Sequence, residues 1–240
     1  MTYKLIPPAQ NQNDCLVLFA RSKKQIMKKI FFLLVTAALL FSFSKPVGDY
    51  PFDKWDAATF EKANTAKDEA GYTAEEKKVV YYANLARLKP DLFAKTYFQK
   101  YMDSTKTKVT SFTRSLFNDL TTKYKPMEVL TVKQDLTEEA TEHAKDTGKK
   151  GNLGHFTGDG KSYEARMKKF KGIYSSTSEN CDYGNQDALS IVIHLLIDEG
   201  QGTIEHRKTM MDKNLKYIGV SIQPHKKEKW TCVMDFANTK

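Results

Sequence analysis

Cysteine is scarce in this sequence, which has three among its 240 residues. So few thiols cannot build the dense disulfide network that stabilises small extracellular folds, and packing must therefore supply most of the stability. The material for a core is present, because hydrophobic residues make up 40% of the chain and aromatic residues 12%. This composition excludes wholesale disorder, and the length allows one large domain or two small ones.

A hydrophobic run long enough to span a membrane is also lacking. The most apolar stretch is Ile30 to Phe43, which carries no charge. As a helix it would reach about 21 Å, short of the roughly 30 Å hydrocarbon core of a bilayer. It directly follows Lys28 and Lys29, and a basic region followed by a short apolar one is typical of a signal peptide. We therefore expect a secreted protein, extracellular or periplasmic, with no membrane span after signal cleavage.

Residues 1–26 precede this signal. Because a signal peptide normally begins a chain, we expect translation to begin at Met27, with a long n-region as the alternative. Ser44 is placed for cleavage directly after it, although Ala37 or Ala38 could serve. Without residues 1–44 the formal net charge falls from +9 to about +4, which is too mild to favour a nucleic-acid partner.

The remaining chain is predicted to comprise an N-terminal extension, 45–71, with Trp55 and Phe60 as candidate anchors, and one domain, 72–240. Thr73 and Glu76 have the spacing of a capping box, which begins a helix that ends at Pro90. Further helical patterns cover 91–101, 112–120, 136–147, 162–170 and 187–199. Two strand patterns, 217–223 and 230–237, follow with a charged turn between them. Helices followed by a hairpin predict an α+β domain whose sheet is covered by helices.

Two cysteines remain in the exported chain, since Cys15 lies in the removed segment. An even pair in an oxidising compartment makes Cys181 and Cys232 a candidate disulfide. Closing a loop of about 51 residues would contribute roughly 4 kcal/mol. The alternative is a pair of buried free thiols, because Cys232 has apolar neighbours in its strand.

Four short segments carry residue types that suit chemistry: 154–156, 178–180, 198–200 and 205–207. Taken singly, each has an ordinary structural interpretation. A histidine in a glycine-rich loop is usually solvated, and a carboxylate before a helix can simply offer charge to its N-terminus. Their order along the chain is more informative than any one of them.

From about Thr73 to the C-terminus, this order of motifs resembles the CAP superfamily, which includes cysteine-rich secretory proteins, insect antigen 5 and plant pathogenesis-related proteins. It is most similar to the bacterial secreted branch. The motifs are NLARLKP (84–90), the 136–144 helix ending in EHA, GHFTGDGKSYEARM (154–167), SENCDYG (178–184), LLIDEG (195–200), EHRKTMMDKNLKYIGVSI (205–222) and CVMDFA (232–237).

The resemblance implies an α-β-α sandwich, in which a central antiparallel sheet is flanked by helices, with a cavity lined by two histidines and two acidic residues. Residue by residue, it assigns this lining to His155, Glu179, Glu199 and His206, with Asp198 competing with Glu199 for the second acidic position. Further candidates for the cavity wall are His143, Asn180, Asp198 and Arg207. Of the other histidines, His194 is predicted to pack structurally and His225 to be solvated in the charged turn.

Two imidazoles and a carboxylate can hold Zn²⁺ or another divalent cation with one position left open. A carboxylate outside the coordination sphere could act as a base or orient a histidine. A metal-free polar cavity would use the same residues.

The resemblance favours a binding or interaction module for a small molecule, lipid, glycan or protein. The alternative is a metal-assisted, peptidase-like hydrolase, with His155 and His206 as ligands and Glu179 or Glu199 as base. A third hypothesis is a structural envelope protein whose cavity is vestigial.

Overall fold

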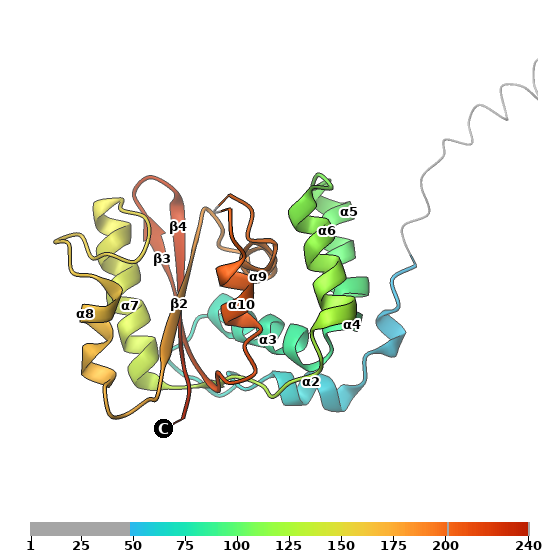
Figure 1. Cartoon of the computed structure of the whole chain (residues 1–240), viewed down its shortest axis with the longest axis horizontal. Coiled ribbons are helices and arrows are strands. Elements are labelled where there is room, and N and C mark those ends of the chain that lie inside the picture. The colour runs from blue at the N-terminus through green and yellow to red at the C-terminus, as the bar shows by residue number, and fades with distance from the viewer. Residues whose placement is uncertain (1–48, 201, 240) are drawn as a thin grey trace, which may run out of the picture. The chain divides into compact units, whose positions relative to one another are not determined.

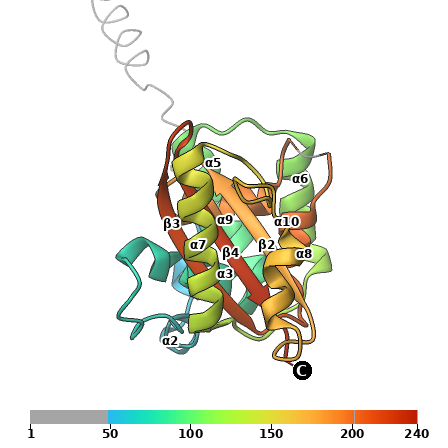
Figure 2. The same cartoon turned by 90° about the vertical axis from the view of Figure 1, so that its left-hand side faces the viewer.

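The structure is a computed structural model that describes residues 49–200 and 202–239. The predicted signal peptide, start site and cleavage position fall on residues 1–48 and lie outside the described residues. None of the described helices combines the length and the hydropathy that crossing a bilayer requires. In the described part, a sheet lies between two groups of helices, and α7 and α8 cover one face while α3, α9 and α10 lie on the other (Figures 1 and 2).

The sheet contains four strands in the order β1-β3-β4-β2. They are β1 (Thr131–Val132), β2 (Thr177–Tyr183), β3 (Tyr217–His225) and β4 (Lys229–Ala237). β2 and β3 both pair antiparallel with β4, but β1 pairs parallel with β3. The predicted α+β sandwich is therefore confirmed, with a mixed sheet in place of a wholly antiparallel one.

The helical patterns of the sequence correspond to helices of the structure. Their bounds are α2 Ala57–Ala63, α3 Ala74–Leu88, α4 Pro90–Phe93, α5 Gln99–Thr105, α6 Ser111–Asn118, α7 Gln134–Lys150, α8 Tyr163–Met167, α9 Ala188–Ile197 and α10 Glu205–Met210. π-helical turns at Ala94–Phe98 and Asp119–Lys123 extend α4 and α6. The sequence did not predict α10, because six residues are too few to display a helical period.

The N-terminus of α3 holds the outer edge of the sheet. Thr73 and Glu76 form the predicted capping box. The second oxygen of Glu76, Oε1, accepts a hydrogen bond from the backbone N–H of Ile222 at 2.8 Å, and the hydroxyl of Tyr72 accepts one from Val220 at 2.9 Å. β1 is too short to reach these two residues of β3. Side chains from the start of α3 thus replace the missing strand partner.

Helix α7 packs closely on β3 because glycine stands at both ends of the contact. A Cβ atom on Gly219 would lie 2.2 Å from the carbonyl carbon of Leu136, and one on Gly148 would lie 2.3 Å from the carbonyl oxygen of Pro224. Any larger residue would force the two elements apart. Gly148 is therefore an interior helix residue, and Gly151, with φ of 75°, ends α7.

Buried polar side chains of α3 join the chain segments around the helical layer. Arg87 is fully buried and donates to the backbone carbonyls of Glu128, Met210, Asp212 and Leu215. All of these bonds end on backbone carbonyls of segments distant from α3 in the sequence, and such groups must be satisfied when they are buried. The NLARLKP motif thus has a structural role.

Candidate functional site

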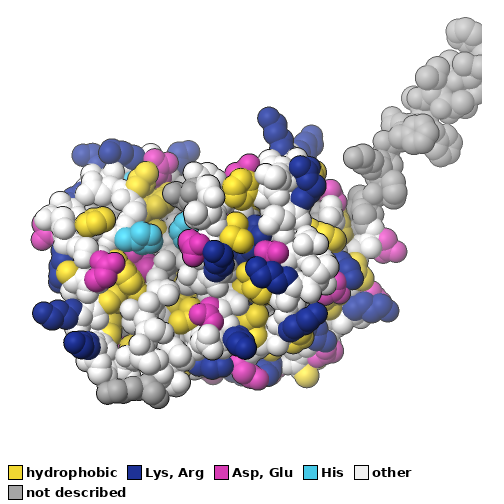
Figure 3. Space-filling model, viewed as in Figure 1, with side chains coloured by type: hydrophobic (Ala, Val, Ile, Leu, Met, Phe, Trp, Pro, Cys, Tyr) yellow, Lys and Arg dark blue, Asp and Glu magenta, His cyan; other side chains and the backbone are white. Residues whose placement is uncertain are grey.

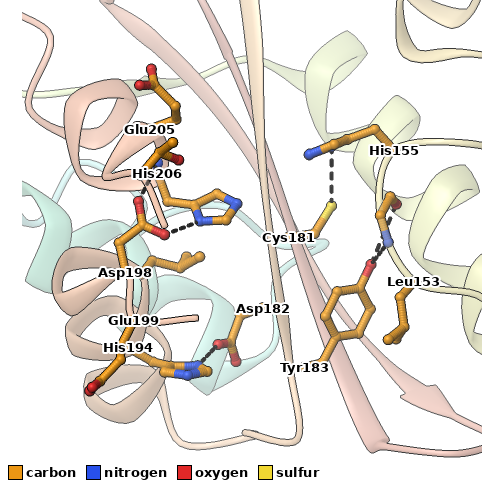
Figure 4. Close-up of a pocket in the computed structure, with 13 residues that line it drawn as sticks. Leu153, His155, Cys181, Asp182, Tyr183, His194, Asp198, Glu199, Glu205 and His206 are labelled. Atoms are coloured by element: carbon orange, nitrogen blue, oxygen red, sulfur yellow. Dashed lines mark hydrogen bonds and ion pairs between the residues drawn. The ribbon is translucent and has the colours of Figure 1, made fainter. Parts of the chain in front are cut away.

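A cavity of about 500 Å³ opens at the free edge of β2. One wall is the loop that contains Leu153 and His155, and the opposite wall is the end of α9 with the start of α10 (Figure 4). Histidine and acidic side chains lie next to one another on this face of the molecule (Figure 3). Cys181, Asp182 and Tyr183 of β2 form the floor between the walls.

On the loop side, His155 pairs with Glu179. The Nδ1 atom of His155 lies 2.8 Å from Oε1 of Glu179, which is buried on β2. Behind this pair, Arg166 of α8 donates to both oxygens of Glu179 at 2.7 and 2.6 Å and to Glu139 of α7 at 2.7 Å. Three elements therefore hold the carboxylate that orients His155.

The charges around Glu179 keep it ionised despite its burial. Burial alone would raise the pKa of Glu179, but the hydrogen bond from His155 and the charges of His143 and Arg166 lower it below its ordinary value. The neighbouring Cys181 shows the opposite balance. Burial raises the pKa of its thiol, and the negative charge of Glu179 raises it further. Cys181 is therefore a neutral thiol and not an activated nucleophile.

On the helix side, His206 pairs with Asp198. Its Nδ1 lies 2.6 Å from Oδ1 of Asp198, and its backbone N–H donates to Oδ2 at 2.8 Å. Asp198 can reach α10 because it ends α9 in the left-handed region, with φ of 57°. Glu199 instead accepts a hydrogen bond from Thr110 at 3.3 Å, and among the described residues no hydrogen bond or ion pair joins it to His155 or His206. Figure 4 shows its side chain pointing away from His206.

A third pair, His194 with Asp182, also lines the cavity. The hydrogen bond to Asp182 raises the pKa of His194 above its usual value. His194 was predicted to be packed in a helix, but its side chain is half-exposed. This pair was not predicted from the sequence, because Asp182 lies in a strand that was not predicted either.

The remaining histidines support the cavity from behind. His143 is buried on α7, where its Nε2 donates to the carbonyl of Gly154 at 3.1 Å and lies 3.7 Å from Glu179. His225 was predicted to be solvated, and this was wrong. It is buried, donates to the carbonyl of Asn152 at 2.9 Å, and so connects the end of β3 to the cavity loop.

Two other candidate wall residues have structural contacts outside the cavity. Arg207 is fully buried and donates to the carbonyls of Leu196 and Ile197 and to the carboxylate of Asp119, so it joins α9, α10 and the end of α6. Arg207 therefore does not line the cavity. Asn180, also buried, donates from its amide to the carbonyl of His206 at 3.0 Å and so positions α10 against β2.

The candidate disulfide is not formed. Cys181 and Cys232 are both buried free thiols. In the antiparallel register Cys181 lies opposite Val233, whereas Cys232 lies opposite Asp182. Neighbouring positions along a strand point to opposite faces of a sheet, so the two sulfur atoms lie on different faces. Packing alone must supply the stability that a disulfide would have added.

Among the described residues, one set of donor atoms could hold a metal ion. His143, Glu179 and Cys181 bring one donor atom each within 4.8 Å of one another, in a buried position. Two further histidines, His155 and His206, line the cavity. His155 and His206 each bind a carboxylate through Nδ1, and no hydrogen bond between described residues uses either Nε2. A histidine held in this way by a carboxylate is the usual arrangement of a zinc ligand.

The chain belongs to the CAP family. The model of this family, described as the cysteine-rich secretory protein family, matches residues 80–236. No match is found among curated proteins.

Solved structures similar to this chain come from bacteria. An outer surface protein from Borrelia burgdorferi is 18% identical, with a TM-score of 0.40 over 48% of this chain and 80% of that one. An extracellular protein with an SCP domain from Bacillus anthracis is 18% identical, with a TM-score of 0.38 over 47% of this chain and 35% of that one. A cysteine-rich secretory protein from Staphylococcus aureus is 16% identical, with a TM-score of 0.37 over 52% and 38%.

Proposed function

We propose that this chain is a secreted CAP-domain protein that binds its ligand in the cavity at the edge of β2, with Zn²⁺ or a similar divalent cation held between His155 and His206. The observation that carries the proposal is the facing arrangement of the two histidines. Both imidazoles approach β2 from opposite walls (Figure 4). Each is paired with a carboxylate through Nδ1, His155 with Glu179 and His206 with Asp198. The predicted signal peptide and the family described as secretory support export.

The residues of the cavity would have different roles in binding a cation. Asp198 and Glu179 fix the tautomer of the two histidines, because a carboxylate requires the proton to be on Nδ1. The Nε2 lone pairs then remain for a cation. A bound divalent cation would supply an open coordination position for an anionic or carbonyl group of the ligand. Glu199 and Glu205 lie further out on the same wall.

The buried set His143, Glu179 and Cys181 is a second candidate for a cation. A cation there would compete with Arg166 for Glu179, both of whose oxygens already accept from the guanidinium. It would also have to displace the proton of Cys181, whose pKa burial raises. Because of these two costs, we favour His155 and His206 over the buried set as the ligands of the cation.

Among the described residues, neither carboxylate that contacts His155 or His206 is free to act as the base of the hydrolase alternative. Glu179 and Asp198 are both committed to imidazoles. The Cys181 sulfur lies 3.9 Å from Nδ1 of His155, but this nitrogen already donates to Glu179. Binding without turnover is therefore the function that the geometry supports best. Turnover in a peptide and ester library that disappears in Glu179→Gln would contradict this conclusion.

The test is a calorimetric titration of the metal-stripped protein with Zn²⁺. We expect His155→Ala and His206→Ala each to weaken binding by about 10-fold or more. His194→Ala is the matched control, because it removes another carboxylate-paired histidine from the same cavity and should leave the affinity within about twofold. Weaker binding in His143→Ala alone would move the cation to the buried set. Unchanged binding in all variants would refute the cation site.

A further inference from the structure

The outer edge of β2 presents unpaired backbone groups to the cavity. In the described part of the chain, β2 is the last strand of the sheet and pairs with β4 alone. At the two ends of this pairing, Gly184 donates to Trp230 and Asn238 donates to Ser176. Hydrogen-bonded pairs alternate along antiparallel strands. The even-numbered residues of β2 therefore bond to β4, and the backbone N–H and C=O groups of Cys181 and Tyr183 point outward.

These outward groups have no partner in the described part of the chain. No hydrogen bond between described residues reaches the backbone N–H or C=O of Cys181 or Tyr183, and both residues line the cavity. The opposite side of the sheet is different, because Tyr72 and Glu76 cover the free N–H groups of β3. One edge of the sheet is thus closed by side chains, while the other is left open at the cavity. An open edge pairs readily with another extended chain.

The charge of the cavity indicates which extended chain would fit. Four acidic residues line it, and no lysine or arginine does so among the described residues. Asp182 and Asp198 are paired with histidines, whereas Glu199 and Glu205 are exposed on the outer part of the wall. Without residues 1–44 the chain still carries a formal charge of about +4, so this acidic lining is a local feature. Leu153, which is 57% exposed, adds an apolar contact on the other wall.

We propose that the free edge of β2 binds an extended, basic segment of a polypeptide, which adds to the sheet as a fifth strand beside Cys181 and Tyr183. The added strand would lie about 4.8 Å from β2, between the two walls that carry His155 and His206. Backbone hydrogen bonds supply the affinity in this mode, and alternate side chains supply the specificity. The inference rests on the cavity being the binding site, as proposed above, but it does not require the cation.

The first test uses a fluorescent octapeptide of alternating lysine and valine, acetylated and amidated, with binding measured by anisotropy. The expected result is binding of this peptide and none of its counterpart with glutamate in place of lysine. Methylation of single backbone nitrogens should then weaken binding with a period of two residues, by about fivefold at each position that donates to β2. A scan without this period, or equal binding of the glutamate peptide, would overturn the proposal.

The second test changes the protein. Tyr183→Pro removes one outward N–H, and proline is tolerated on an edge strand where the N–H faces away from the sheet. Tyr183→Ala is the matched control, because it loses the same ring but keeps the N–H. We expect the proline variant to bind the peptide about fivefold more weakly than the alanine variant. If the proline variant fails to fold, the methylation scan by itself tests the strand pairing.

These experiments can refute the cation proposal and the strand-pairing proposal independently of one another. If every histidine variant binds zinc as wild type does, and the methylation scan shows a period of two residues, the cation proposal is refuted and the strand pairing is supported. If the histidine variants lose zinc affinity but the methylation scan shows no period of two residues, only the strand pairing is refuted. Dimerisation in sedimentation velocity that Tyr183→Pro abolishes, without any peptide binding, would overturn the proposal by identifying a second copy of this chain as the occupant.

Discussion

Asp235 allows a sharp test of the buried charge cluster behind the cavity. This residue lies on β4 directly opposite Glu179 and is fully buried. Neither of its carboxyl oxygens has a hydrogen-bond partner among the described residues. Burial raises the pKa of Asp235 well above its ordinary value, and the negative charge of Glu179 raises it further. The folded protein therefore keeps a proton that the unfolded chain releases.

The size of the effect follows from proton linkage. A group whose pKa is raised by folding contributes stability that is fully present below its unfolded pKa, here about 3.9, and is lost as the pH rises through the folded pKa. Between these two values the native state binds one proton more than the unfolded state. The free energy of unfolding then falls by about 1.4 kcal/mol for each pH unit. Asp235→Asn removes this contribution.

Urea denaturation of wild type and Asp235→Asn should measure the difference across a pH series from about 5 to about 8. We expect the variant to gain stability relative to wild type as the pH rises, with the slope given above, until the folded-state pKa of Asp235 is passed. Asp68→Asn is the control, because it removes a carboxylate from an exposed position. Parallel stability curves for wild type and Asp235→Asn would refute the reasoning, since Asp235 would then be ionised and paired in the native state.

Three further predictions concern structural contacts. Thr73→Ala removes the cap of α3 and should lower the free energy of unfolding by about 1 kcal/mol in urea denaturation; no change would show that the capping box does not stabilise the helix. Arg207→Met leaves buried carbonyls and a carboxylate without donors, so we expect a loss of about 3 kcal/mol or more in the same assay, and near wild-type stability would contradict its joining role. Cys181 and Cys232 should resist an alkylating reagent in the native protein. After unfolding without reductant, each should take up one equivalent, as measured by intact mass. If alkylation occurs only after reduction, the two cysteines form a disulfide.

Local rules predicted the helical layers well because their signals lie within a few residues of one another. The spacing of Thr73 and Glu76 is sufficient to place the start of α3. The two strands of the hairpin were also predicted from a local signal, because most of their side chains are apolar. β2 gave no such signal. Its sequence contains the buried polar residues Glu179, Asn180 and Asp182, which are acceptable inside the protein only because distant partners pair with them.

The candidate site depended on contacts that no local pattern contains. The choice between Asp198 and Glu199 depends on the left-handed backbone of Asp198, which turns that carboxylate toward α10. The burial of His225 depends on the loop carbonyl of Asn152, which is remote in sequence. Likewise, the separation of the two thiols follows from the register of β2 on β4. Motif order pointed to His155 and His206, which both line the cavity, but it missed His194, and three-dimensional pairing was needed to identify the partner of each.

The central claim is that two histidines, each held by its own carboxylate, face one another as a single cation site. The most direct measurement is the Zn²⁺ affinity of Asp198→Asn beside that of Glu199→Gln, since the two substitutions make the same chemical change at adjacent positions on one wall of the cavity. We expect about a 10-fold to 100-fold loss of affinity in Asp198→Asn and a value within about twofold of wild type in Glu199→Gln. Equal affinities in the two variants, or a loss confined to Glu199→Gln, would contradict the claim.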